Sequence, residues 1–262
     1  IFIKNNKRNF ISMIHKTTLL SVIELAWFEV KIKYTRSILG PFWITLSMII
    51  LIAGLSFVFV SLFGVPLKKT MPWIALGIII WNYISNYLDE SSTLFVDGRI
   101  LNMRISPLKL VTINMFKHLI ILFHNSVVII GVVIIFNLEI TANYFYLIFS
   151  FVIIILNSLS LGILFAFLCC RYRDFILILR NLIYLTFLMT PIFWMPDILK
   201  GNRMLLADVN IVYQIIQSIR DPILGNSLSN YSISYLIIFT TIISTLAFLI
   251  FKKFHKRIVF WI

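Results

Sequence analysis

One apolar stretch of the sequence carries polar side chains at a regular spacing that could serve chemistry. Between residues 82 and 97 they recur at intervals of three and four residues: Asn82, Ser85, Asn86, Asp89, Thr93 and Asp97. On a helix that advances 100° per residue, they share one arc of about 120°. If this helix spans a membrane, the arc must face water or protein, because lipid cannot satisfy its hydrogen bonds. The stripe therefore predicts either the wall of a hydrated pathway or a hydrogen-bonded helix interface, and the sequence does not decide between them.

A second polar group lies in the next apolar stretch, which four residues interrupt: Asn114, Lys117, His118 and Asn125. We expect Lys117 and His118 to lie at the cytoplasmic mouth of a helix and to extend outward to water. A proton relay would need carboxylates and histidines deep in the bundle. The only acidic residues expected there are Asp89 and Glu90, which weakens the case for a proton-coupled transporter.

The usual enzyme signatures are missing from the sequence. It contains no P-loop pattern GxxxxGK[ST], no GxSxG, no HExxH and no pair of carboxylates at metal-binding spacing. Cys169 and Cys170 are adjacent, so they do not readily form a disulfide, and we interpret them as small residues at a helix end. We therefore predict a chain that is not an enzyme, with no catalytic residue, no metal site and no bound cofactor.

The composition places these groups in a membrane protein. Hydrophobic residues make up 60% of the chain and charged residues only 13%, whereas soluble domains carry roughly 25% charged residues. A spanning helix needs about 20 mostly apolar residues. The 262 residues hold six such segments and little else, so we predict an all-α membrane protein. The six predicted spans are residues 38–63, 72–96, 110–138, 144–170, 175–194 and 233–251.

The positive charges predict the orientation. The chain has a formal net charge of +13 from 23 Lys and Arg against 10 Asp and Glu. Seventeen of the basic residues fall in the two terminal segments and in the connections on the same side, against five on the other side. Basic loops stay in the cytoplasm, so both termini are expected there, in the inner membrane of a bacterium. Because the charges lie between apolar segments, we expect no nucleic-acid partner.

Two connections are longer than a turn requires, and they divide the chain into residues 1–37 and the six-helix domain 38–262. In the first, one helical stripe carries Leu19, Ile23, Ala26, Trp27, Val30 and Tyr34. It predicts a helix in the membrane interface, with a soluble helix packed on the protein as the alternative. Residues 195–231 contain a second apolar segment, 209–219, which is too short to span and predicts a re-entrant or interfacial helix on the periplasmic side.

Three collinear stretches resemble one known family. Residues 27–47, WFEVKIKYTRSILGPFWITLS, resemble the signature W-x-[DE]-[IV]-K-x-[RK]-Y-x-R-S-x-L-G-P-F-W-x-T-L-S of type-2 ABC exporter permeases for O-antigen, capsule and teichoic-acid polymers. Residues 174–194 follow an Arg and end in FLMTPIFW, similar to the family's RD-F…TPI-x-W stretch. Residues 209–225, VNIVYQIIQSIRDPILG, resemble its periplasmic N-P-x-Y…R-x-P-L-L-G segment. Two residues differ from those that are usual in the family: Thr35 stands where Arg is common, and Ile211 stands where Pro usually follows the Asn.

The resemblance implies a homodimer of permeases with two cytoplasmic ABC ATPase subunits, which would bind ATP and Mg²⁺. It implies that residues 97–109 form a coupling helix that docks on the ATPase, through Arg99, Ile100, Leu101, Met103 and Arg104. The exposed apolar side chains of that loop also suit a protein partner. The interface helix would use three further residues: Trp27, Tyr34 and Arg36. Periplasmic gate helices would span residues 209–222 and include three more: Tyr213, Arg220 and Pro222.

The cargo implied by the resemblance is a lipid-linked polysaccharide, most simply O-antigen or capsule, which crosses a channel between the two permeases. Aromatic rings stack on the C–H faces of sugars, and the polar stripe would keep the hydroxyls hydrated. We therefore predict nine channel-lining residues: Phe57, Phe59, Trp81, Asn82, Tyr83, Asn86, Tyr87, Asp89 and Phe193. Two alternatives are an ABC exporter of drugs or small lipids and an integral-membrane glycan-modifying enzyme that would use Asp89.

Overall fold

A computed structural model describes residues 19–33, 40, 42–96, 105–139, 141–196 and 207–261. Most of these residues are helical and none of them forms a strand. The α-helices are α2 (Leu19–Lys33), α3 (Phe42–Phe63), α4 (Leu67–Thr93), α6 (Pro107–Ile135), α7 (Tyr146–Arg171), α8 (Asp174–Met189), α10 (Ile211–Ile223) and α11 (Asn230–Phe254). Two short 3-10 helices complete the set: η1 (Ala142–Phe145) and η4 (Ile258–Phe260).

Local sequence signals account for several helix ends. The Ser106 hydroxyl accepts a hydrogen bond from the main-chain N–H of Lys109, with a proline in the first turn of α6. Asn210 caps α10 in the same way, through the main-chain N–H groups of Val212 and Tyr213. The cap therefore fixes the start of α10 at Ile211. α8 ends at Met189, before Thr190 and a proline that cannot continue the helix.

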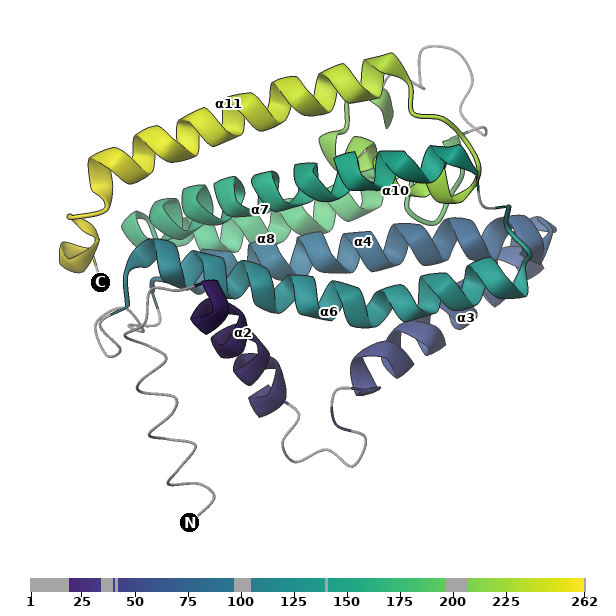
Figure 1. Cartoon of the computed structure of the whole chain (residues 1–262), viewed down its shortest axis with the longest axis horizontal. Coiled ribbons are helices and arrows are strands. Elements are labelled where there is room, and N and C mark those ends of the chain that lie inside the picture. Colours follow the sequence, from purple (N-terminus) through teal and green to yellow (C-terminus); the bar gives the residue numbers. More distant parts are fainter. Residues whose placement is uncertain are drawn as a thin grey trace.

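The long helices lie side by side, as Figure 1 shows, with α4 at the centre of the bundle. α4 packs against α3, α6, α7, α8 and α10, whereas α11 lies along α7. α2 lies at one side of the bundle, at a steep angle to the long helices, and packs on α6. Residues 74–80 of α4 are all buried, so this helix is enclosed on every side over two turns. Such a helix is expected to be apolar all round, which Ile74–Ile80 satisfies.

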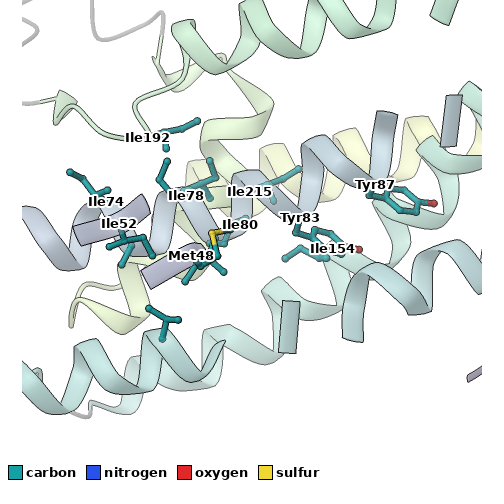
Figure 2. Close-up of a cluster of buried hydrophobic side chains, with 14 of the residues drawn as sticks. Met48, Ile52, Ile74, Ile78, Ile80, Tyr83, Tyr87, Ile154, Ile192 and Ile215 are labelled. Atoms are coloured by element: carbon teal, nitrogen blue, oxygen red, sulfur yellow. The ribbon is translucent and has the colours of Figure 1, made fainter. Parts of the chain in front are cut away.

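The main core fills the space around this central segment (Figure 2). Met48 and Ile52 of α3 meet Ile78 of α4 there, together with Ile154 of α7 and Ile215 of α10. A second core lies toward the other end of α4, where Phe95 and Phe167 meet edge to face with ring centroids 5.3 Å apart. In a membrane such contacts stabilise the bundle through close packing, because lipid is as apolar as the core.

Four helical segments are long and apolar enough to cross a membrane: Phe42–Phe63, Pro107–Ile135, Asn143–Arg171 and Asn230–Phe254. The chain is therefore a helical membrane protein by these features. The segments predicted as the second and fifth spans correspond to α4 and α8, which are not among the four. α4 has 27 residues, but the polar stripe lowers its hydropathy, and α8 has only 16 residues. A straight crossing takes about 20 residues.

The face of α2 that packs on the protein coincides only in part with the stripe predicted for the membrane interface. α2 buries Ser21, Val22, Leu25, Ala26 and Val30. Ala26 and Val30 belong to both this buried face and the predicted stripe, whereas Leu19 and Leu20 are exposed. That the stripe lies in the membrane interface stays a prediction. The helix packs on α6 through Val22, Leu25 and Ala26, which form a small apolar cluster with Ile113.

Candidate functional site

The polar stripe of α4 lines a cavity of about 640 Å³. We call it the α3–α4–α6 cavity after the helices that form it. α4 contributes four residues of the predicted lining, Asn82, Tyr83, Asn86 and Asp89, and also Glu90 and Thr93. α3 and α6 supply the remaining walls, which include Trp43, Ser47, His118 and Asn125, and Lys33 reaches in from the end of α2. Four of the nine predicted lining residues therefore share one cavity. Its volume lies in the range of binding sites for small molecules, about 300–1,000 Å³.

Hydrogen bonds order the stripe itself. The side-chain amide of Asn86 donates to the main-chain oxygen of Asn82 at 2.9 Å and to the side-chain oxygen of Asn82 at 3.0 Å. The Asp89 carboxylate accepts from Nε of Arg180 on α8 at 2.7 Å. This pair lies at the bundle surface, because the two side chains are 46% and 50% exposed. The stripe thus serves both purposes that the sequence left open, since it lines a cavity and binds a neighbouring helix.

An ion network closes the end of the cavity near α2. Nζ of Lys117 on α6 lies 3.1 Å from the Glu29 carboxylate of α2 and also contacts the Glu90 carboxylate of α4. His118 Nε2 lies 3.0 Å from the other Glu90 oxygen. The side chains of Lys117 and His118 are only 10% and 6% exposed. The prediction that these two residues extend outward to water is therefore wrong, because two carboxylates compensate their burial.

Two buried tyrosines join the stripe to α7. The hydroxyls of Tyr83 and Ser158 are hydrogen bonded at 2.6 Å. The Tyr87 hydroxyl donates to the main-chain oxygen of Ser158, also at 2.6 Å. Gly162 lies so close that a Cβ there would be 1.9 Å from the Tyr87 oxygen. Tyr87 therefore points away from the α3–α4–α6 cavity, whereas Tyr83 contributes to its wall.

The other predicted aromatic lining residues lie elsewhere. Phe57 is 72% exposed on α3. Phe59 meets Phe193 with ring centroids 5.4 Å apart. Phe187 joins Phe193 and Trp81, at 5.6 and 5.4 Å. These rings form a chain from α3 through the segment after α8 to α4, outside the α3–α4–α6 cavity. Their role in lining a channel between two copies stays a prediction.

The predicted gate residues lie in α10. Tyr213 and Pro222 are buried there. Arg220 is fully buried, at 0% exposure, and its guanidinium donates to the main-chain oxygens of Pro191 and Ile192 at 3.0 Å each. It also lies 3.8 Å from the centroid of the Trp73 ring, at the start of α4. Arg220 thus ties α10 to the break after α8 and to α4, and a buried cation without these contacts would be costly.

Several predicted residues lie outside the described part of the chain. They are Tyr34 and Arg36 of the interface helix and the whole predicted coupling set: Arg99, Ile100, Leu101, Met103 and Arg104. Trp27 is described and lies half-buried on α2. Its ring stacks on the His124 ring of α6, with centroids 5.9 Å apart. Nζ of Lys31 lies 5.4 Å from the centroid of the Trp27 ring.

Sequence reasoning missed three residues that the geometry brings to these sites. Glu29 lies within the first family-like stretch, and only the packing of α2 on α6 reveals its pairing with Lys117. Arg180 looked like one more positive charge of a cytoplasmic loop. Gly77 gave no signal, although a Cβ there would lie 2.2 Å from Nη2 of Arg220. Contacts between segments far apart in the chain create all three roles.

No group of three or more His, Cys, Asp or Glu side chains within the described ranges could hold a metal ion. Cys169 and Cys170 are buried free thiols. The arrangement offers hydrogen-bond donors and acceptors, one carboxylate–histidine pair and aromatic walls. Neither the models of known protein families nor the curated proteins give a match to this chain.

Proposed function

We propose that this chain is the transmembrane permease subunit of an ATP-driven ABC exporter that moves a lipid-linked polysaccharide across the bacterial inner membrane. Two copies would form the channel and two cytoplasmic ATPases would supply the energy from ATP and Mg²⁺. The observation that carries the proposal is the α3–α4–α6 cavity. It combines amides, hydroxyls and carboxylates inside a bundle whose helices α3 and α6 are long and apolar enough to span a membrane.

The chemistry of the cavity suits a cargo rich in hydroxyl groups. Asn82 and Asn86 offer amide groups, and Asp89 offers a carboxylate, while Trp43 adds a ring on the opposite wall. Hydroxyls donate and accept hydrogen bonds, so such walls replace water around a sugar at little cost. An apolar drug or a small lipid would offer no partner for the hydrogen-bonding capacity that these groups keep beyond the Asn82–Asn86 and Asp89–Arg180 bonds. This favours a glycan over the cargo of a drug or small-lipid exporter.

Two features favour a second copy of the chain as partner. α8 buries a single residue of its own, Leu179. In addition, Asp89 and Arg180 form an exposed ion pair on its flank. An exposed charge pair within a spanning region cannot face lipid. In a channel between two copies, this pair would face water or protein. α4 and α8 would then complete six spans per copy. Both termini would lie in the cytoplasm.

The energy source is proposed to dock at residues 97–109. Loss of the chain in its host should deplete the surface polysaccharide and accumulate the lipid-linked polymer on the cytoplasmic side. Tagged protein purified from mild-detergent membranes should bring with it vanadate-sensitive ATP hydrolysis. Arg104→Glu should weaken that association, and Arg257→Glu is the matched charge control from the other end of the chain. Unchanged surface polysaccharide in the deletion strain would overturn the proposal.

A glycan-modifying enzyme is the second candidate, and one observation favours it. His118 and Glu90 form a close pair, and both line the cavity. A histidine held by a carboxylate is a common general base. An enzyme of this kind would lose turnover in His118→Asn while the polymer still reached the surface. The exporter proposal expects instead that polymer structure is unchanged and that only the amount exported falls.

A further inference from the structure

A second recess lies at the opposite end of α4 from the α3–α4–α6 cavity. It has a volume of about 720 Å³ and lies between the start of α4 and the end of α10, so we call it the α4–α10 cleft. Its walls include Trp73 from α4 and Tyr213 from α10, with Asp221 and Asn226 at the end of that helix. Lys68 adds a positive charge from the first turn of α4. Neither the polar stripe nor the ion network contributes to this cleft.

The aromatic walls of the cleft are held in place from behind. The Trp73 ring lies against the buried Arg220 guanidinium, 3.8 Å from its carbon to the ring centroid. Its Nε1 donates to the main-chain oxygen of Trp194 at 3.2 Å. Tyr213 is 8% exposed. A ring fixed at two points loses little conformational freedom when a ligand stacks on it, so binding there costs little entropy.

The polar side of the cleft is centred on a carboxylate. The Gln217 side-chain amide donates to Oδ1 of Asp221, and the Asn226 main-chain N–H donates to the Asp221 main-chain oxygen at 2.9 Å. A carboxylate has about four acceptor sites, so Asp221 keeps capacity for donors from a ligand. Hydroxyl groups are such donors, whereas an anionic group such as a phosphate would be repelled by the Asp221 carboxylate. Together with the rings, this chemistry is that of a carbohydrate site.

The charges at the rim refine the class of sugar. Lys68 and Lys69 are both exposed and both line the cleft. They stand on the α4 side, whereas the Asp221 carboxylate stands on the α10 side. A ligand that is acidic at one end and bears hydroxyls at the other would match this division.

We propose that the α4–α10 cleft binds a saccharide unit and prefers acidic sugars, with the hydroxyls on Asp221 and the acid group toward Lys68 and Lys69. The site differs from the cavity on which the proposed function is based. The saccharide proposal goes beyond that function because it names a property of the glycan. It can fail while the exporter proposal stands.

The test measures binding to the purified full chain in a sugar-free amphipol, by equilibrium dialysis with labelled trigalacturonate. We expect saturable binding that is stronger than that of neutral maltotriose. Asp221→Asn should weaken trigalacturonate binding about tenfold, because a hydrogen bond to a charged group is lost. The double variant Lys68→Gln, Lys69→Gln should abolish the preference over maltotriose. Asn86→Leu, in the other cavity, is the control that should leave binding unchanged.

Two results would overturn the proposal. One is trigalacturonate binding that Asp221→Asn leaves unchanged or that Asn86→Leu abolishes. The other is binding of glycerol phosphate in place of either sugar, which would identify the cleft as a site for a lipid headgroup. Each variant is first checked for an unchanged elution volume and a melting temperature no lower than that of the wild type, so that loss of binding reports the cleft. Because no ATPase is present, failure here is separate from failure of the export test.

Discussion

Gly77→Ala tests whether Arg220 holds the centre of the bundle together. A Cβ at position 77 would lie 2.2 Å from Nη2 of Arg220 and 2.7 Å from the main-chain oxygen of Ile192. Ordinary contact begins at about 3.4 Å, so the oxygen must retreat by about 0.7 Å and the guanidinium by more than about 1 Å. Because Nη2 donates to that same oxygen at 3.0 Å, the shift removes a hydrogen bond of a buried cation.

The magnitude follows from three contributions. Overpacking a well-packed site costs about 1–3 kcal/mol. A lost hydrogen bond to a buried charged group costs about 1.5–3 kcal/mol. The better helix propensity of alanine returns about 0.5–1 kcal/mol. We therefore expect a net loss of about 3 kcal/mol, which lowers the melting temperature of a protein of this size by roughly 6–12 °C.

The assay is scanning fluorimetry of the purified protein in detergent, with Gly131→Ala as the matched control. Gly131 lies in α6, and no described heavy atom lies within 4 Å of a Cβ built there. Its substitution should leave the melting temperature unchanged or slightly raised. In an Arg220→Met background, Gly77→Ala should cost at least about 1 kcal/mol less, because the charged group is gone. Equal melting temperatures for Gly77→Ala and Gly131→Ala would refute the reasoning.

Three further predictions concern other contacts of the bundle. Gly162→Ala places a Cβ 1.9 Å from the Tyr87 hydroxyl, so we expect a loss of about 2–4 kcal/mol in the same melting assay, partly relieved by Tyr87→Phe. Lys117→Met leaves two carboxylates without their shared cation, and we expect a loss of about 2–4 kcal/mol that Lys117→Arg largely avoids; equal stability of both variants would contradict the network. Burial raises the pKa of Asp221 to about 6, outweighing the nearby Arg220 charge. Protonation therefore favours the folded state, and this stabilisation is lost as the pH rises from about 4 through about 6. The melting temperature of Asp221→Asn should lack that decline, and parallel curves for variant and wild type would count against it.

The sequence predicted the helices well because their signals are local. The predicted spans and the observed helices differ by at most five residues at any end among the described residues. The polar stripe on α4 was also predictable, since side chains at positions 82, 86 and 89 share a face of any helix that contains them. They line one cavity together, whose other walls come from α3 and α6. Chain periodicity is sufficient to predict the shared face.

The failures have a different physical origin. The face of α2 that packs on α6 was not part of the prediction, because α2 is short and apolar on more than one side. Lys117 and His118 looked like residues at a helix mouth, because Glu29 and Glu90, which pair with them, come from two other helices. The predicted aromatic lining concerns a channel between two copies and stays a prediction; composition alone does not indicate the direction in which a ring points.

The two buried cations suggest how α4 combines polar functions with stability in a membrane. Lys117 lies near one end of α4 and is compensated by carboxylates from α2 and α4. Arg220 lies near the other end and is compensated by main-chain oxygens and the Trp73 ring. A helix with polar side chains along one face gains little from lipid, so its position must come from contacts with other helices. Because contacts with other helices fix α4 at both ends, the helix can expose its polar stripe to the α3–α4–α6 cavity without stabilising contacts from lipid.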